Sequence, residues 1–375
     1  MDPMMRYPFF EDLLRPFRKS QTKTLALIMA AIAECGQARS FAIATVMAQW
    51  LRIRLDSAVN RFYRLLRNHR VDETLLVERW AGLLAKRTKG HLTISIDWSE
   101  WHHELRMLAA AVVVGKRAVP LWVQAFKKVV RRRSQNSREN TFIRVLADAL
   151  KRAGVTATIL CDRGFRRVTW LALLGKLSLD FVVRLQSDVT VELQNGTRIT
   201  LDKIKLFPGK PINLGVVPLR SDGAIEVRLV GYLARGAKEP WWLATSLGGA
   251  CWSILKLYDR RMTVEEQFRD TKGRRFGVKL FWTQFRDPDQ LARFAMLLGV
   301  AVLIWAAAGF EAARRQPSLR LVSRTKGPRQ SYVTIGIRVV ASGGTAKPLT
   351  SRRLAHWQEP PNLRKVGRLR FGAAK

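Results

Sequence analysis

The spacing of hydrophobic residues divides this chain into segments of different kinds. Over residues 1–90 apolar residues recur at helical spacing, most clearly in residues 24–35, 41–51 and 57–70. In the last of these segments arginines surround one apolar helical face, made by Val59, Phe62, Leu65 and Leu66. A bundle of short helices with a basic outer face is typical of a DNA-binding domain, and a basic surface that only contacts water is the alternative. We therefore predict an N-terminal helical DNA-binding domain over residues 1–90.

Strand patterns begin after Gly90. Apolar and β-branched runs predict strands in HLTISID, in the hairpin LRMLAAAVVVGKRAVPLWVQAF with its turn at Gly115-Lys116, in VTATILCD and in DFVVRL. Helical spacing between them predicts helices over residues 139–153 and 169–176. Asn136 or Ser137 is the expected N-cap of the first helix, and Gly154 is its expected stop. A strand-to-strand crossover through a helix implies parallel pairing, so residues 91–186 predict the first part of a mixed α/β core.

A β-rich insertion is expected over residues 187–238. Short alternating segments there are separated by turn residues at Asn195-Gly196, Pro208-Gly209 and Asp222-Gly223. PWWLATS then continues the buried sheet, and a long helix is expected over residues 253–272, ended by Gly273. Residues 295–310 form an apolar run shorter than the ~20 residues of a membrane-spanning helix, which predicts a helix buried against the sheet. Residues 239–315 thus form the second part of the core.

The charge of the chain indicates a polyanionic partner. There are 66 Lys and Arg against 29 Asp and Glu, giving a formal net charge of +37, while 47% hydrophobic residues is ordinary for a globular protein. Nucleic acid is the usual partner of such a chain, and an anionic membrane surface is the rival. Residues 316–375 hold 13 Lys or Arg and one acid, Glu359. We predict that they form a basic tail, partly ordered at most, on DNA phosphates.

Cysteine usage and the first residues indicate a cytoplasmic protein. Cys35, Cys161 and Cys251 are far apart and odd in number, which fits a reducing cytosol better than a disulfide framework. The N-terminus, MDPMMRYPFFEDLLRPF, has acids and prolines where a secretory signal has an apolar core. We expect no targeting peptide and no membrane partner.

Two aspartates follow apolar strands. Asp97 comes at the end of HLTISI and Asp162 at the end of VTATILC. Ligands of open α/β sheets gather at the carboxyl ends of the strands, although Asp is also common there as a turn or helix cap. Hard cations such as Mg²⁺ prefer carboxylate oxygens and keep several waters. If the two strands are neighbours, Asp97 and Asp162 are therefore candidate metal ligands.

One face of the long predicted helix carries a row of polar groups. Tyr258, Arg261, Glu265 and Lys272 lie at relative positions 0, 3, 7 and 14. At about 100° per residue all four fall within a stripe of about 60°. Such a row has no obvious use in a core, and it suits a surface where Glu265 completes a metal site while its neighbours hold a phosphate backbone. A surface ion pair alone would explain Arg261 and Glu265 but not the other two.

These residues carry a specific resemblance. YDRRMTVEEQFRDTK resembles the Tyr, Arg, Glu and Lys signature of DDE transposases of the bacterial insertion-sequence-four family, without a gap in the spacing. CDRGF around Asp162 is similar to that family's second-aspartate motif, and IDWSEW around Asp97 occupies the place of the first. Trp98 and Ser99 depart from the Asp-x-Thr form common in relatives. The resemblance covers about residues 90–285.

The resemblance implies an RNase H-like mixed sheet flanked by helices, with a β-rich insertion before the catalytic Glu. It implies that Asp97, Asp162 and Glu265 bind two Mg²⁺ ions, for which Mn²⁺ can substitute. Trp241, with Trp242 as the fallback, would stack on a flipped base, and Arg184 would contact DNA. Core packing is the alternative for both tryptophans.

The implied activity is cut-and-paste transposition by strand cleavage, a hairpin intermediate and strand transfer. The implied partners are the terminal inverted repeats, target DNA and a second copy of the chain in the synaptic complex, in the nucleoid of a bacterial cell. A stand-alone RNase H-like nuclease and a non-catalytic DNA-binding protein are the alternatives. His102-His103 with Cys161 lack zinc-ligand spacing, and Ser99 or Ser134 gives no organised nucleophile, base and acid.

Overall fold

The computed structural model describes most of the chain. It describes residues 3–343 apart from 87, 102–103, 115–116, 129–131, 194, 221–223, 266–282, 284 and 321–329. The N-terminal helices are α1 (Pro3–Arg6), α2 (Phe9–Leu14), α3 (Lys19–Cys35), α4 (Ser40–Leu51), α5 (Leu55–Leu66) and α6 (Glu73–Ala85). The later helices are α7 (Arg132–Arg152), α8 (Val168–Lys176), α9 (Cys251–Asp259), α11 (Pro288–Arg315) and α12 (Tyr332–Ala341), with short 3-10 turns η1 (Arg163–Phe165), η2 (Leu201–Lys203) and η4 (Pro317–Arg320).

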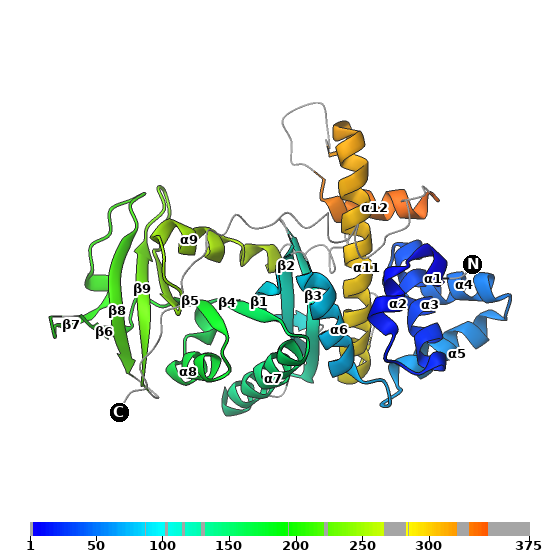
Figure 1. The fold of residues 1–375 in the computed structure, drawn as a ribbon, viewed down its shortest axis with the longest axis horizontal. Coiled ribbons are helices and arrows are strands. Elements are labelled where there is room, and N and C mark those ends of the chain that lie inside the picture. Colours follow the sequence, from blue (N-terminus) through cyan, green and yellow to red (C-terminus); the bar gives the residue numbers. More distant parts are fainter. Residues whose placement is uncertain are drawn as a thin grey trace.

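Ten strands are described. They are β1 (His91–Trp101), β2 (Leu105–Val114), β3 (Arg117–Lys127), β4 (Thr156–Cys161), β5 (Asp180–Leu185), β6 (Thr190–Glu192), β7 (Arg198–Thr200), β8 (Ile212–Arg220), β9 (Ala224–Tyr232) and β10 (Trp241–Thr245). Eight of them form one sheet in the order β3-β2-β1-β4-β5-β10-β9-β8, and β6 pairs with β7. In Figure 1 this sheet and helices α1–α5 lie on opposite sides of α11, and α6 lies beside β3 on the sheet side.

The predicted mixed α/β sheet is confirmed. β4 pairs in parallel with β1 and with β5, and the other pairs of the large sheet are antiparallel. The strands predicted between residues 187 and 238 are present, but β8 and β9 continue the main sheet through β10. Half of the expected insertion is therefore an extension of the core sheet, because the exposed edge of β10 offers backbone groups for pairing.

Alternate residues of the central strands face different helical layers. Leu160 of β4 and Val182 of β5 pack in one cluster with Ile254 and Leu257 of α9. Their neighbours Ile159, Cys161, Phe181 and Val183 belong instead to the main core with α7 and α8. Figure 1 shows α9 on one side of the sheet and α7 and α8 on the other. This two-residue period explains why both strands are apolar throughout.

Helix α11 is the central support of the fold. It contains the apolar run at residues 295–310, and it is long and apolar enough to cross a membrane by length and composition. Its most apolar 18-residue window is 100% buried within the protein. Gly299 lies so close to Pro120 of β3 that a Cβ atom would be 2.8 Å from the Pro120 carbonyl oxygen, and Trp305 donates to the Ala33 carbonyl oxygen at 2.8 Å. The predicted helix buried against the sheet is confirmed. Helices α3 and α4 pass the same membrane test only as one span broken by a 112° bend.

The N-terminal segment is helical as predicted, but three of its helices, α1, α2 and α6, were not predicted individually. The three predicted helices correspond to α3, α4 and α5. Helix α6 was missed, although Asp72 accepts hydrogen bonds from the amides of Thr74 and Leu75 and caps it. Trp80 of α6 donates to the Pro120 carbonyl oxygen at 3.0 Å and ties α6 to the sheet.

The expected start of α7 was wrong. Helix α7 begins at Arg132, so Asn136 and Ser137 lie inside it and neither is its N-cap. The buried Glu139 accepts a hydrogen bond from the Gln135 side chain one turn earlier. This contact stabilises the helical turn in which Asn136 and Ser137 lie. Gly154, with φ +67°, does end the helix. In the predicted tail, the short helix α12 packs on α11, with Gly336 against Trp305 and with Val333, Ile335 and Val340 buried. Residues 344–375 lie outside the described residues.

Glycine-to-alanine substitutions test the α11–α12 crossing. A Cβ atom at Gly309 would lie 1.8 Å from the Tyr332 carbonyl oxygen, and one at Gly336 would lie 1.7 Å from that of Trp305. We expect Gly309→Ala to lower the free energy of unfolding by at least about 2 kcal/mol, because backbones this close cannot separate without loss of packing. Urea denaturation measures the change.

Gly82→Ala in α6 is the matched control, since its Cβ would meet nothing within 4 Å. It should leave stability unchanged or raise it by up to ~1 kcal/mol through helix propensity. Equal stability of the Gly309→Ala and Gly82→Ala proteins would contradict the close crossing.

Candidate active site

Strand register places Asp97 and Asp162 side by side. The parallel pairing of β1 with β4 ends at Ile96 opposite Cys161, and each aspartate is the next residue. Asp162 follows the end of β4, whereas β1 continues to Trp101 because it remains paired with β2. Asp97 therefore lies within β1, opposite Ala109, and not at the strand end that the sequence suggested. The two strands are neighbours, as the metal-site hypothesis requires.

The Asp162 side chain also caps the turn that follows it. Its Oδ1 accepts a hydrogen bond from the Gly164 amide at 2.8 Å, and Asp162 is the N-cap of η1. Asp162 is therefore a cap, the alternative role that the sequence suggested for an aspartate at this position. A carboxylate has about four acceptor sites, so one amide bond leaves capacity for a cation.

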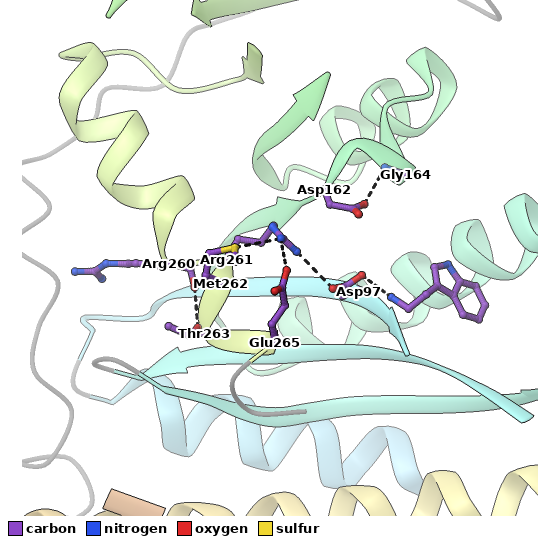
Figure 2. A network of polar contacts seen from close by, with 9 residues as sticks. Asp97, Asp162, Gly164, Arg260, Arg261, Met262, Thr263 and Glu265 are labelled. Atoms are coloured by element: carbon purple, nitrogen blue, oxygen red, sulfur yellow. Dashed lines mark hydrogen bonds and ion pairs between the residues drawn. The ribbon is translucent and has the colours of Figure 1, made fainter. Parts of the chain in front are cut away.

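Arg261 joins the first aspartate to the glutamate. Its guanidinium lies 3.4 Å from Asp97 Oδ2 and donates to Glu265 Oε1 at 2.6 Å. Figure 2 shows the Arg261 side chain between these two carboxylates, with Asp162 on the neighbouring segment. Arg261 is 8% exposed and Asp97 is partly buried. Charges this sheltered from water interact strongly, so each carboxylate here affects the others.

Burial and neighbouring charge raise the pKa of Asp97 from its ordinary value of 3.8 to about 6. Loss of hydration is the largest cause, followed by the negative charge of Asp162, while Arg261 acts in the opposite direction. Glu265 adds a smaller raising effect. Three carboxylates that repel one another offer the oxygen ligands that a hard divalent cation prefers. In the part of the chain that the structure describes, however, no three His, Cys, Asp or Glu side chains converge closely enough to hold a metal, since Arg261 stands between two of them.

The predicted exposed stripe is partly wrong. Helix α9 ends at Asp259, and around Arg260 the amide bonds run three residues back, from Arg261 to Tyr258 and from Val264 to Arg261. A single uninterrupted helix is therefore absent, and Lys272 and Gly273 lie outside the described residues. Tyr258 is 4% exposed, because the stripe faces the sheet and not the solvent. Burial raises its pKa to about 12.

The two tryptophans of β10 differ in environment. Trp241 is partly exposed and its ring meets that of Tyr258 edge to face, with centroids 5.1 Å apart. Trp242 is 1% exposed and lies against Gly231, where a Cβ would be 2.3 Å from its ring. The fallback residue is thus a core residue, and Trp241 is the one that solvent reaches.

Arg184 lies on β5 beside the same face. It donates to Glu239 Oε2 and to the Pro240 carbonyl oxygen, both at 3.1 Å. Glu239 also pairs with Arg163, which follows Asp162, at 3.2 Å. The acid is 62% exposed, so these pairs are screened and readily exchanged for another anion.

Glu139 of α7 is a buried acid that the sequence reading did not single out as functional. It is 1% exposed, accepts from Trp98 Nε1 at 2.8 Å and pairs with Arg167 at 2.7 Å. Trp98 follows Asp97, and Arg167 follows the turn capped by Asp162. One carboxylate thus fastens both aspartate-bearing segments to α7. An acid within a basic helix gives no sequence pattern that distinguishes it from a solvated residue.

Fold and site together define an α/β protein with two aspartates side by side where the parallel pairing of β1 with β4 ends. Comparison with known families is specific: a profile described as the transposase DDE domain matches residues 89–304, more than half of the chain. The chain belongs to this family and is a DDE transposase, a metal-dependent enzyme that cleaves DNA.

Other comparisons add little. No curated protein matches the chain. Among solved structures it is similar to the Marinitoga piezophila Argonaute in complex with 5′ OH guide RNA and target DNA, at 11% identity and a TM-score of 0.22. The match covers 66% of this chain and 35% of that one.

The Asp97 carboxylate should destabilise the metal-free protein at neutral pH. Its folded pKa of about 6 exceeds the ordinary 3.8, so the penalty is absent below pH 3.8, grows between these values and is complete above pH 6. In EDTA at pH 7.5 we expect Asp97→Asn to raise the free energy of unfolding by on the order of 1–3 kcal/mol, an advantage that disappears as the pH falls to about 4.

Urea denaturation across this pH range measures the effect. Asp56→Asn is the control, because the Asp56 side chain is 84% exposed. A stability of Asp97→Asn equal to wild type at every pH would show that Asp97 is not under strain from burial and repulsion.

Truncating Glu139 should cost far more than truncating an exposed acid. Glu139→Ala leaves Arg167 without its partner in a buried setting, so we expect a loss of about 3–5 kcal/mol in the free energy of unfolding. Glu192→Ala, which breaks an exposed pair with Arg198, should cost less than about 1 kcal/mol. Comparable small losses in both proteins would mean that Glu139 does not fasten the two segments.

Proposed function

We propose that this enzyme is a cut-and-paste transposase of the insertion-sequence-four family, with Asp97, Asp162 and Glu265 as its catalytic carboxylates. The carrying observation is that Arg261 contacts both Glu265 and Asp97, a residue 164 positions away in the chain. Asp162 lies beside Asp97 through strand register. Three segments that lie far apart in the sequence thus supply acids to one small region. The segment that supplies Glu265 also carries the spacing of the Tyr, Arg and Glu signature.

The acids fit a divalent cation in number and chemistry. Asp97, Asp162 and Glu265 would hold two Mg²⁺ ions, or Mn²⁺ in their place, and bound ions would supply charge neutralisation at the attacking and leaving oxygens of a phosphoryl transfer. Carboxylates must be charged to do this, and the raised pKa of Asp97 shows that the protein alone disfavours that charge. A cation bound between these carboxylates would compensate their mutual repulsion, which burial strengthens.

The other residues of the region would position DNA. Arg261 contacts two acids in the described structure, and binding of a cation by those acids would free its guanidinium for a phosphate. Arg184 would exchange Glu239 for phosphate in the same way, and Lys272 would add a further cation. Trp241 is accessible for stacking on a base, and Tyr258 supports its ring.

The proposed substrates are the terminal inverted repeats of an insertion sequence and a target duplex. Strand cleavage, a hairpin at the cut end and joining to the target would follow in that order, carried out by a homodimer that holds both ends in a bacterial cytoplasm near the nucleoid. The high net positive charge of +37 supports a polyanionic partner of this size.

Glu265→Gln tests the assignment. We expect Mg²⁺-dependent cleavage of a plasmid carrying the reading frame with its flanking DNA to fall by at least ~100-fold, because an amide replaces a charged ligand. DNA affinity, measured by fluorescence anisotropy in EDTA, should be unchanged. Glu226→Gln is the matched control, since Glu226 is exposed on β9, and it should cleave like wild type.

Full cleavage by Glu265→Gln would contradict the assignment. Cleavage by wild type without hairpin ends on a labelled terminal fragment would favour a nuclease over a transposase. Binding without any cleavage would favour a non-catalytic DNA-binding protein.

A further inference from the structure

Helices α4 and α5 form a helix-turn-helix unit. α4 ends at Leu51 and α5 begins at Leu55, so only Arg52, Ile53 and Arg54 connect them. Arg52 adopts the left-handed conformation, with φ 54°, and the Ile53 amide bonds back to the Ala48 carbonyl oxygen at 3.2 Å. A non-glycine residue in this conformation is held there by its surroundings. Two helices joined by a tight turn of this length are the arrangement that presents a helix to DNA.

The orientation of α5 is fixed by its packing. Ala58, Phe62, Leu65 and Leu66 are buried, and Phe62 meets Phe294 of α11 with ring centroids 5.8 Å apart. The Tyr63 hydroxyl donates to Ser40 Oγ of α4 at 3.1 Å, and Arg61 donates to Thr24 Oγ1 of α3 at 3.5 Å. The helix is therefore seated on rigid neighbours, and its opposite face points to solvent.

That outer face carries polar and cationic side chains. Ser57, Asn60, Arg64 and Arg67 are exposed and follow one another at helical spacing. Two adjoining open cavities of about 550 and 620 Å³ lie over this face, and Asn60, Arg64 and Asn68 line both. The described residues that line them include no acid, and Arg70 adds another positive charge. Asp56, the acid on α5, has Arg54 at 3.9 Å.

We propose that α5 enters the major groove of duplex DNA and that Asn60 and Arg64 read base edges there. Asn forms paired hydrogen bonds with adenine, and Arg forms them with guanine. Arg67 and Arg70, at the C-terminal end of the face, contact phosphates and set the register. The duplex fits this face because the face is cationic and polar, with Ser20, Gln21 and Thr24 of α3 beside it as further polar groups. The inference rests on the proposed DNA partner and adds the surface that selects its sequence.

Selection from a library of random duplexes tests this surface without knowledge of the natural site. Full-length protein in EDTA is mixed with the library, and bound duplexes are sequenced. Wild type should enrich a motif, and Asn60→Ala and Arg64→Ala should each flatten one or two of its positions. Affinity for the wild-type motif should fall on the order of 5- to 100-fold for each variant, as for loss of a paired base contact.

Arg144→Ala is the charge-matched control, because Arg144 is exposed on α7, away from this surface. It should keep the wild-type motif. Circular dichroism melts confirm that the variants fold, since exposed substitutions cost little stability.

Three outcomes would overturn the inference: an unchanged motif in both α5 variants, no motif in wild type, or preference for anionic phosphatidylglycerol vesicles over every duplex. The assay needs neither metal nor cleavage, so its failure is distinct from activity retained by Glu265→Gln. No DNA binding at all would reject the proposed substrate as well.

Discussion

The active region depends on the parallel pairing of β1 with β4, which forces two aspartates to be neighbours. Because Ile96 lies opposite Cys161, Asp97 and Asp162 follow at the same level of the sheet. Burial, followed by the negative charge of Asp162, raises the pKa of Asp97. The surrounding structure therefore has to hold like charges together. Glu139 of α7 fixes the two aspartate-bearing segments by its hydrogen bonds with Trp98 and Arg167. Arg261, in the segment that follows α9, contacts Asp97 directly.

This arrangement explains why a guanidinium is buried at the centre of the site. Arg261 is 8% exposed, and its single positive charge compensates part of the negative charge of the two acids that it contacts. Polar groups that are costly to fold together are typical of places where function and not stability determines the sequence. Leu160 and Val182 both face α9 and pack against its apolar side, which holds the segment that carries Arg261 on the sheet. Helix α11 packs against β3 at one edge of the sheet.

Sequence patterns predicted the parts that depend on local periodicity. The mixed sheet, the order of its helices and strands and the buried apolar helix followed from hydrophobic spacing, and the strand ends indicated Asp97 and Asp162. Helix α6 was missed although Asp72 gives it a local N-cap, but most of what else was missed depends on distant contacts. Helical spacing correctly placed Tyr258 and Arg261 on one side of the segment. It could not predict that this side is buried against the sheet, because β5 and β10 determine that burial. Glu139 has no local pattern, because its role comes from Trp98 and Arg167. Helix α12 is too short to be recognised without α11 beneath it.

We propose that Asp97, Asp162 and Glu265 surround one metal-binding site. Fe²⁺ can substitute for Mg²⁺ at such oxygen sites and, with ascorbate and peroxide, cleaves the polypeptide backbone close to where it is bound. On the DNA-bound protein, fragment mass spectrometry should find cuts beside all three residues, suppressed together by excess Mg²⁺. Cuts confined to other segments, or cuts at one of the three that persist in excess Mg²⁺, would contradict a shared site.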